Sequence, residues 1–117
     1  MWVRRAEIEP LDFAGLAIRD YTSGTALESS LATIEVPSGA RHAPAWSKRS
    51  DKYYLVLAGE IEFSLADETR RLARGDFCLV PREQRFSYRN PTSRPAELLL
   101  VHTPSFDLDS EVFEESE

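Results

Sequence analysis

The stretch GDFCLVPREQRFSYRN, residues 75–90, decides the fold of this chain. It opens on a Gly-Asp turn signal, and the short apolar run 77–80 that follows is stopped by a proline. Residues 85–89 then alternate, with Phe86 and Tyr88 on one side and polar residues on the other. Short runs bounded by Gly and Pro, together with a period of two, predict two β-strands here.

The same signals recur along the rest of the chain. Residues 60–65 alternate strictly between apolar and polar side chains, and the turn after them lets residues 69–72 return as a hairpin partner. Further strands are expected at residues 17–22, 31–36, 52–57 and 98–102. A helical period is visible only at residues 110–115. Many short strands at close spacing predict an all-β sandwich or barrel of antiparallel strands.

The motif residues carry a family resemblance. Gly75, Pro81 and Asn90 stand in register with the second sequence motif of the cupin family, and Gly59 fits the last glycine of the first motif. The ending HTPSF at residues 102–106 is also similar to that of small single-domain cupins. The resemblance implies a cupin jelly-roll barrel of the RmlC-like type.

The resemblance covers about residues 30–106, and we expect residues 1–117 to form one domain. The net charge of -6 belongs to an acidic tail at 107–117, because the remaining 106 residues carry 14 acidic and 14 basic side chains. The tail is expected to be solvated and partly frayed, although a partner-binding role is an alternative. No segment supplies the basic field that nucleic-acid binding requires.

The start of the chain and its cysteine content bear on the compartment. The first ten residues, MWVRRAEIEP, lack the apolar core of a signal peptide, and the longest apolar run, 98–101, is too short to span a membrane. A cytoplasmic protein without membrane contact is therefore expected. Cys78 is the single cysteine, so an internal disulfide is excluded, and it is expected to be an inert buried thiol.

The positions that bind metal in similar proteins hold other residues here. The resemblance places Lys52 at the position of the carboxylate ligand and Phe86 at that of one histidine. The two remaining histidine positions hold Trp46 and Lys48, or Ala45 and Ser47 on the other spacing. Ammonium and phenyl groups do not ligate transition metals, so we expect no metal and no cofactor. The alternative is a site rebuilt from His42 and His102 with Asp51 or Glu83.

Alternation along the predicted strands suggests which side chains face the barrel interior. If Lys52 points inward, so does Tyr54, and if Phe86 points inward, so do its alternate neighbours. The expected ligand-binding residues are Trp46, Lys52, Tyr54, Gln84, Phe86, Tyr88 and His102. The candidate catalytic residues are Lys52, His42 and Tyr54. Alternatively, the aromatic side chains fill the barrel, and Lys52 pairs with Asp51 or Glu83.

These expectations lead to a metal-independent cupin that binds a small polar or anionic metabolite in its barrel. An isomerase, an epimerase or a lyase would fit such a site, since a desolvated lysine suits a base or a Schiff-base nucleophile. The alternatives are a non-catalytic ligand-binding or accessory module, and a metal-dependent oxygenase using His42 and His102. Whether the protein is an enzyme is left open. A homodimer is expected, because pairing removes open strand edges.

Overall fold

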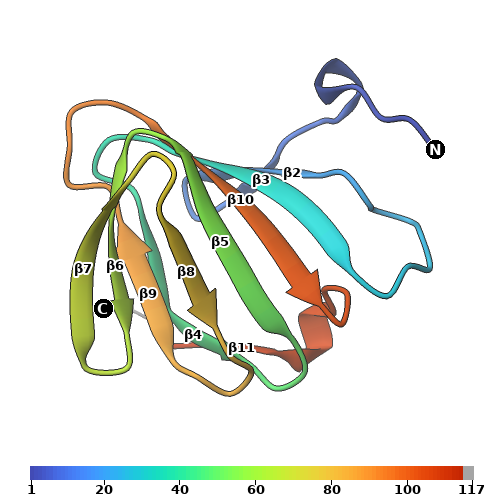
Figure 1. Ribbon diagram of the computed structural model, residues 1–117. Helices are drawn as coiled ribbons and strands as arrows, with labels where there is room; N and C mark the ends of the chain where they lie inside the picture. Colours follow the sequence, from blue (N-terminus) through green and yellow to red (C-terminus); the bar gives the residue numbers. More distant parts are fainter. Residues whose placement is uncertain (115–117) are drawn as a thin grey trace.

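Two antiparallel sheets, packed face to face, make up the computed structural model, which describes residues 1–114 (Figure 1). One sheet has the order β1-β2-β3-β10-β5-β8, formed by Leu11–Phe13, Leu16–Asp20, Ser30–Val36, Ala96–Thr103, Asp51–Ala58 and Phe77–Val80. The other has the order β11-β4-β9-β6-β7, formed by Glu111–Phe113, Arg41–Ser47, Phe86–Arg89, Glu60–Leu65 and Glu68–Ala73. Two single-turn 3-10 helices, η1 at Arg5–Glu7 and η2 at Leu108–Ser110, lie outside the sheets. This arrangement confirms the predicted all-β jelly roll.

Alternating burial explains why these strands form two stacked layers. β10 alternates between buried and partly buried residues along its whole length, and it pairs with β3 on one side and β5 on the other. The buried members of each strand meet between the sheets, where they form one apolar core. Apolar burial of this kind is the main favourable term in folding.

The local backbone structure explains why Gly59 and Asn90 stand at these motif positions. A Cβ on Gly59 would lie 2.7 Å from the Pro95 carbonyl oxygen, and its φ of +74° is strained for other residues. Asn90 is buried, and its amide nitrogen donates to the carbonyls of Val36 at 2.9 Å and Arg94 at 2.7 Å. Both residues therefore fix the loops at one end of the sandwich.

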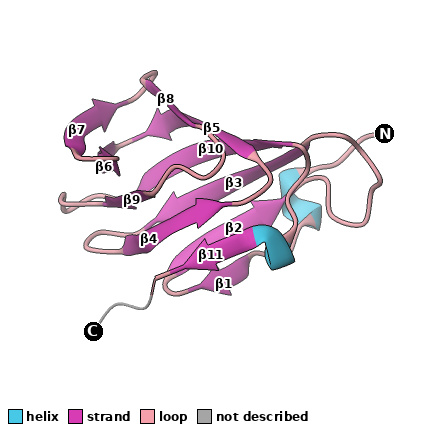
Figure 2. Ribbon diagram, turned by 90° about the horizontal axis from the view of Figure 1, so that it is seen from below, coloured by secondary structure: helices cyan, strands magenta, loops and turns pink. Residues whose placement is uncertain are grey.

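The C-terminal segment differs from the prediction. The helical period at residues 110–115 is wrong, because residues 111–113 form strand β11, which pairs antiparallel with β4 (Figure 2). Residue 115 lies outside the described part. The tail is also not simply solvated, because the Glu111 side chain is only 2% exposed. The structure does not describe the last three residues of the tail, 115–117.

Strand β4 is a second difference. The sequence segment around His42 and Pro44 reads as a loop, yet it is a strand whose pairing with β9 shifts register between His42 and Ala45. A register shift of this kind adds a residue to one strand, which tolerates Pro44 and keeps both His42 and Ala45 turned inward. β4 and β11 together close one side of the barrel next to β1 (Figure 2).

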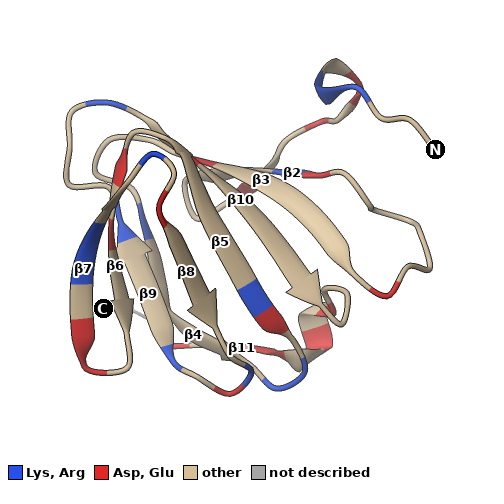
Figure 3. Cartoon of the chain, in the orientation of Figure 1, with Lys and Arg blue, Asp and Glu red and all other residues tan. Residues whose placement is uncertain are grey.

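Charge is distributed unevenly over the strands. Acidic and basic residues lie on β7 and in several loops, whereas β8 carries none (Figure 3).

No helix in residues 1–114 is long and apolar enough to cross a membrane.

Candidate functional site

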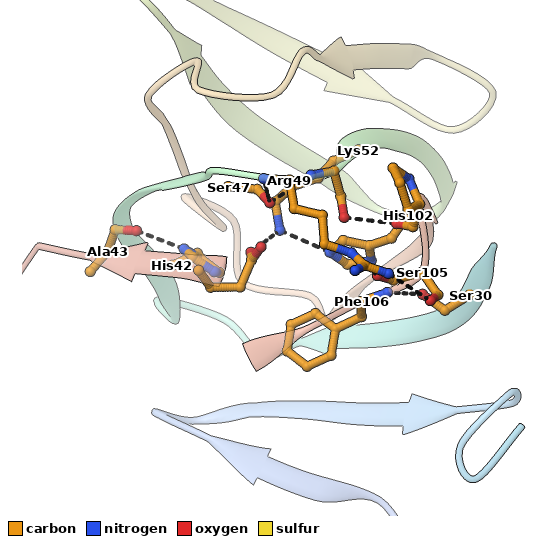
Figure 4. Close-up of polar contacts among 12 residues, drawn as sticks. Ser30, His42, Ala43, Ser47, Arg49, Lys52, His102, Ser105 and Phe106 are labelled. Carbon is orange, nitrogen blue, oxygen red and sulfur yellow. Dashed lines mark hydrogen bonds and ion pairs between the residues drawn. The ribbon is translucent and has the colours of Figure 1, made fainter. Parts of the chain in front are cut away.

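Lys52 lies in the barrel interior with two partners. Along β5, Lys52, Tyr54 and Val56 are buried, while Tyr53 points to the other face. The Lys52 Nζ forms a hydrogen bond of 2.9 Å with Nε2 of His102, the residue opposite it on β10 (Figure 4). It also forms an ion pair with Glu111. The ammonium donates in both contacts, so Nε2 of His102 is the unprotonated nitrogen.

The charges in this cluster compensate one another. Burial lowers the pKa of Lys52, and the Glu111 carboxylate opposes that shift. Burial, followed by the positive charge of Lys52, lowers the pKa of His102 to about 3, so this imidazole is neutral at pH 7. Lys52 and Glu111 therefore form a buried ion pair, and the neutral His102 accepts a hydrogen bond from its lysine.

Glu111 reaches this cluster because β11 is held in place. The Glu111 backbone pairs with Ser47 on the neighbouring strand β4. The Ser110 carbonyl accepts a hydrogen bond of 2.8 Å from the Lys48 N–H. The Glu114 N–H donates to the Pro44 carbonyl at 2.8 Å. One oxygen of Glu111 contacts Lys52, while the other, Oε2, is buried and has no hydrogen-bond partner among residues 1–114.

His42 occupies an adjacent, aromatic region of the interior. Its ring centroid lies 5.1 Å from that of Phe86, 5.2 Å from Tyr88 and 6.1 Å from Phe113. Its Nδ1 is 2.6 Å from the Ala43 carbonyl oxygen (Figure 4). A carbonyl only accepts, so Nδ1 carries the proton and Nε2 the lone pair.

Burial sets the protonation of the groups around His42. Desolvation is the main reason that the pKa of His42 falls to about 4, so its imidazole is neutral at pH 7. Burial raises the pKa of Tyr54 and of Tyr88, so both hydroxyls keep their protons. The Tyr88 Oη is buried and has no hydrogen-bond partner among the described residues.

The aromatic side chains fill this part of the barrel. Tyr54, Phe63, Phe86 and Tyr88 are each only 2–3% exposed, and neighbouring ring centroids lie 5.1–6.5 Å apart. Two hollows of about 520 and 150 Å³ lie elsewhere, one beside η1 and one near residues 20–30. In this conformation the interior therefore corresponds to the packed alternative rather than to an open pocket.

The structure brings together most, but not all, of the predicted site residues. Lys52, Tyr54, Phe86, Tyr88, His42 and His102 all line the barrel interior. Trp46 alternates with the inward-facing Ala45 and Ser47, so it faces the opposite side of the sheet. Gln84 lies in the β8–β9 loop, where its amide donates to the Arg85 carbonyl.

Glu111 and Phe113 are the site residues that the sequence prediction missed. Both lie in the tail, which was expected to be solvated. The acids proposed as partners of Lys52 lie elsewhere, because Asp51 accepts a hydrogen bond from the Arg82 N–H at 2.8 Å and Glu83 is exposed. A buried lysine requires an anion close by, and that requirement is the signal that points to the tail.

The residues present do not fit a transition metal. The Lys52 ammonium, 5% exposed, lies where a ligand carboxylate would be expected, and its Nζ lies 5.4 Å from the centroid of Phe86. Nε2 of His102 is already used by Lys52. Within residues 1–114, no three His, Cys, Asp or Glu side chains are grouped so that they could hold a metal ion.

Comparison with known proteins agrees with this fold. A family model described as a cupin domain matches residues 32–102. An uncharacterized protein from Aquifex aeolicus (strain VF5) is 34% identical over 64 residues, which is 55% of this chain and 52% of that protein. The chain thus matches about half the length of this curated relative.

Several solved structures are similar over nearly the whole chain. Streptomyces Pac13, described as a unique nucleoside dehydratase, has a TM-score of 0.85 at 21% identity, covering 98% of this chain and 91% of Pac13. A predicted oxalate decarboxylase from Thermotoga maritima has a TM-score of 0.82 at 21% identity, covering 89% and 99%. KdgF from Halomonas sp. has a TM-score of 0.81 at 19% identity, covering 92% and 96%. At such low identity these likenesses show the shared fold.

Proposed function

The chain belongs to the cupin family, and from that premise we propose that it is a metal-independent lyase that removes water from a small polar metabolite in its barrel. His42 is the general base, and the Tyr88 hydroxyl binds the oxygen on which negative charge develops. The observation that carries this proposal is the packing of the His42 ring, fixed by Ala43, against the ring of Tyr88, whose buried hydroxyl has no partner among the described residues.

His42 presents an unprotonated ring nitrogen for proton abstraction. Its Nδ1 proton is held by the Ala43 carbonyl, which leaves the Nε2 lone pair for the substrate. Because desolvation keeps the ring neutral, the base form is present at pH 7. The conjugate acid is correspondingly strong, so it readily returns the proton to a leaving hydroxyl group.

The reaction balances without an added reactant. Nε2 of His42 takes a proton from a carbon next to a carbonyl group, and the electron pair of the broken C–H bond forms a C=C bond. The hydroxyl group on the neighbouring carbon leaves with the proton that His42 returns, so water is the second product. Hydrogen bonding from Tyr88 to the carbonyl oxygen stabilises the negative charge that develops there.

Entry of a substrate requires a change in the closed interior. β11 is three residues long and lies at the edge of its sheet, and Phe113 on it packs 5.3 Å from Phe13. Short edge elements are among the least stable parts of a fold. In our proposal, displacement of β11 opens the barrel, and its return excludes water from the reaction.

The proposal also draws on the similar proteins. Pac13 is described as a nucleoside dehydratase, and Pac13 variants have been solved with uridine. Nucleosides whose sugar carries a carbonyl group therefore come first among the candidate substrates. Sugars and hydroxy acids that carry a hydroxyl group one carbon away from an activated C–H bond come next.

Nuclear magnetic resonance in D₂O tests the proposal. The panel of test compounds consists of nucleosides, sugars and hydroxy acids. Wild-type protein should catalyse loss of water from one of these classes, or exchange of its activated proton for deuterium. His42→Ala should lower the rate by about 10²–10⁴-fold, the usual contribution of a general base. Tyr88→Phe should also lower it, whereas the matched variant Tyr53→Phe, on the outer face of β5, should not.

A non-catalytic ligand-binding module is the second candidate. The nearly complete burial of the four aromatic rings favours it, because such packing resembles an ordinary core. Under this alternative a panel compound binds, but neither water loss nor deuterium exchange occurs. A rate that stays unchanged in His42→Ala would also exclude the proposed base.

A further inference from the structure

Two buried side-chain oxygens in residues 1–114 lack a hydrogen-bond partner, and both face the barrel interior. They are Oε2 of Glu111 and Oη of Tyr88. Glu111 bonds with Lys52, and Tyr88 packs against His42, so both oxygens lie in the closed interior between the two sheets, which we call the chamber. Native proteins seldom leave buried polar atoms without a partner, so each calls for an explanation.

The chemistry of these oxygens restricts what can bind them. Glu111 forms an ion pair with Lys52, and the second oxygen of such a carboxylate, Oε2, is a strong acceptor that cannot donate. The Tyr88 hydroxyl keeps its proton and can donate or accept. An acceptor and a hydroxyl in one chamber match a ligand that carries hydroxyl groups.

The charges of the chamber also bear on the ligand. Two of the three Lys52 N–H donors are used by Glu111 and His102, and the neighbouring His42 is neutral at pH 7. A phosphate or carboxylate entering the barrel would thus meet the Glu111 carboxylate and a lysine that is already paired with it. Like charges in a desolvated site are unfavourable, so an anion would lose its hydration without compensation.

We propose that Glu111 is the residue that selects an uncharged, hydroxyl-bearing substrate, with Oε2 accepting a hydrogen bond from one substrate hydroxyl group. This inference rests on the proposed function and names the substrate class of that site. Lys52 and His102 act behind Glu111 and hold its carboxylate in place. The ammonium at the usual position of the metal ligand thus positions a substrate-binding acid.

The position of Glu111 on β11 couples recognition to closure. Phe113, two residues further along β11, packs against Phe13 at 5.3 Å and His42 at 6.1 Å. A substrate hydroxyl bonded to Glu111 therefore favours the same closed arrangement that covers His42. Selection of the substrate and exclusion of water occur in one step.

Binding measurements with simple probes test the selection. The probes are D-ribose, D-glucose and glycerol, each compared with its monophosphate, by protein-observed nuclear magnetic resonance at neutral pH. At least one neutral probe should bind, and its monophosphate should bind more weakly. Glu111→Gln should weaken that binding by about 10–100-fold, the cost of a lost hydrogen bond to a charged group. Glu114→Gln, an exposed acid close by that pairs with Arg85, should leave it unchanged.

A measurement on wild-type protein guards against misfolding of the variant. Deoxyribose and deoxyglucose lack one hydroxyl group each, and the deoxy form of the probe that binds should bind more weakly. Tighter binding of the monophosphates, equal affinity in Glu111→Gln, or no binding of any neutral probe would overturn the inference. If only the proposed lyase activity is wrong, neutral probes should still bind selectively, whereas His42→Ala should have no effect on proton exchange.

Discussion

The two faces of strand β5 reverse the usual distribution of polar and apolar residues. Its inner face buries the charged side chain of Lys52, whereas its outer face exposes 38% of Tyr53. Next to Tyr53, Phe77 and Leu79 on β8 are 54% and 40% exposed. The inner charge is tolerated because Lys52 forms an ion pair with Glu111 and a hydrogen bond with His102. The outer apolar surface is exposed to solvent instead, and surfaces of this kind commonly bind a partner.

The inner face gives the largest expected change in stability. Lys52→Met or Glu111→Leu alone should reduce the free energy of unfolding by about 3–5 kcal/mol, because each leaves a buried charge without its partner. The double variant should recover most of that loss, since apolar groups then replace the whole pair. Urea unfolding of the four proteins gives the coupling energy directly.

The exposed pair Arg85–Glu114, at the end of the same segment, is the matched control. Arg85→Met and Glu114→Leu should each cost about 1 kcal/mol or less, as surface ion pairs usually do. Additive effects of Lys52→Met and Glu111→Leu would contradict the burial and pairing described for the inner face.

The two buried histidines predict a loss of stability in mild acid. Their pKa values in the folded protein, about 4 for His42 and about 3 for His102, lie below the value of 6.5 for a free side chain. Between these values the unfolded chain binds more protons, so stability falls as the pH drops below about 6.5. Each histidine should remove up to about 1.4 kcal/mol per pH unit in that window.

Urea unfolding at several pH values measures this slope. His102→Gln should reduce the slope between pH 6.5 and 5 by about half, because one of two titrating groups is then removed. A stability that does not change over this range would show that the inner histidines are exposed or charged.

The outer face should matter for assembly more than for folding. A homodimer stays a prediction, and the apolar surface of β5 and β8 offers an interface for it besides the open edge at β1. Light scattering at micromolar concentration should give the mass of two chains, and Phe77→Ser should shift it toward one. Leu108→Ser, at an exposed apolar residue on η2, should not. A wild-type mass of one chain contradicts the prediction.

Removal of metal should have the smallest effect. Since Lys52 and Phe86 replace the usual ligands, a chelator should leave the melting temperature unchanged. Elemental analysis should find no transition metal in stoichiometric amount. Near-stoichiometric zinc, iron, manganese or nickel that is lost in His42→Ala would instead support a rebuilt centre.

Sequence patterns predicted the inner face of β5 well, because strict alternation makes Lys52, Tyr54 and Val56 face one way. They did not reveal β4, since Pro44 and the register shift beside it interrupt the alternation that identifies a strand. That interruption also hid the inward direction of His42.

The role of Glu111 was hidden for a different reason. Six acidic residues in the last eleven indicate a solvated tail, and composition gives no way to distinguish one buried acid among them. The missing information is tertiary, because Glu111 and Lys52 are 59 residues apart in the chain. Only the need of a buried ammonium for an anion connects the two in the sequence.

The most direct test of a neutral, metal-independent base at His42 is its titration by ¹H–¹⁵N nuclear magnetic resonance of the imidazole nitrogens. Our account predicts a neutral ring with the proton on Nδ1 from pH 8 down to about pH 5, and a pKa of about 4. His102→Gln separates the signals of the two histidines. A His42 ring that titrates near 6.5, or that carries its proton on Nε2 at neutral pH, would contradict the account.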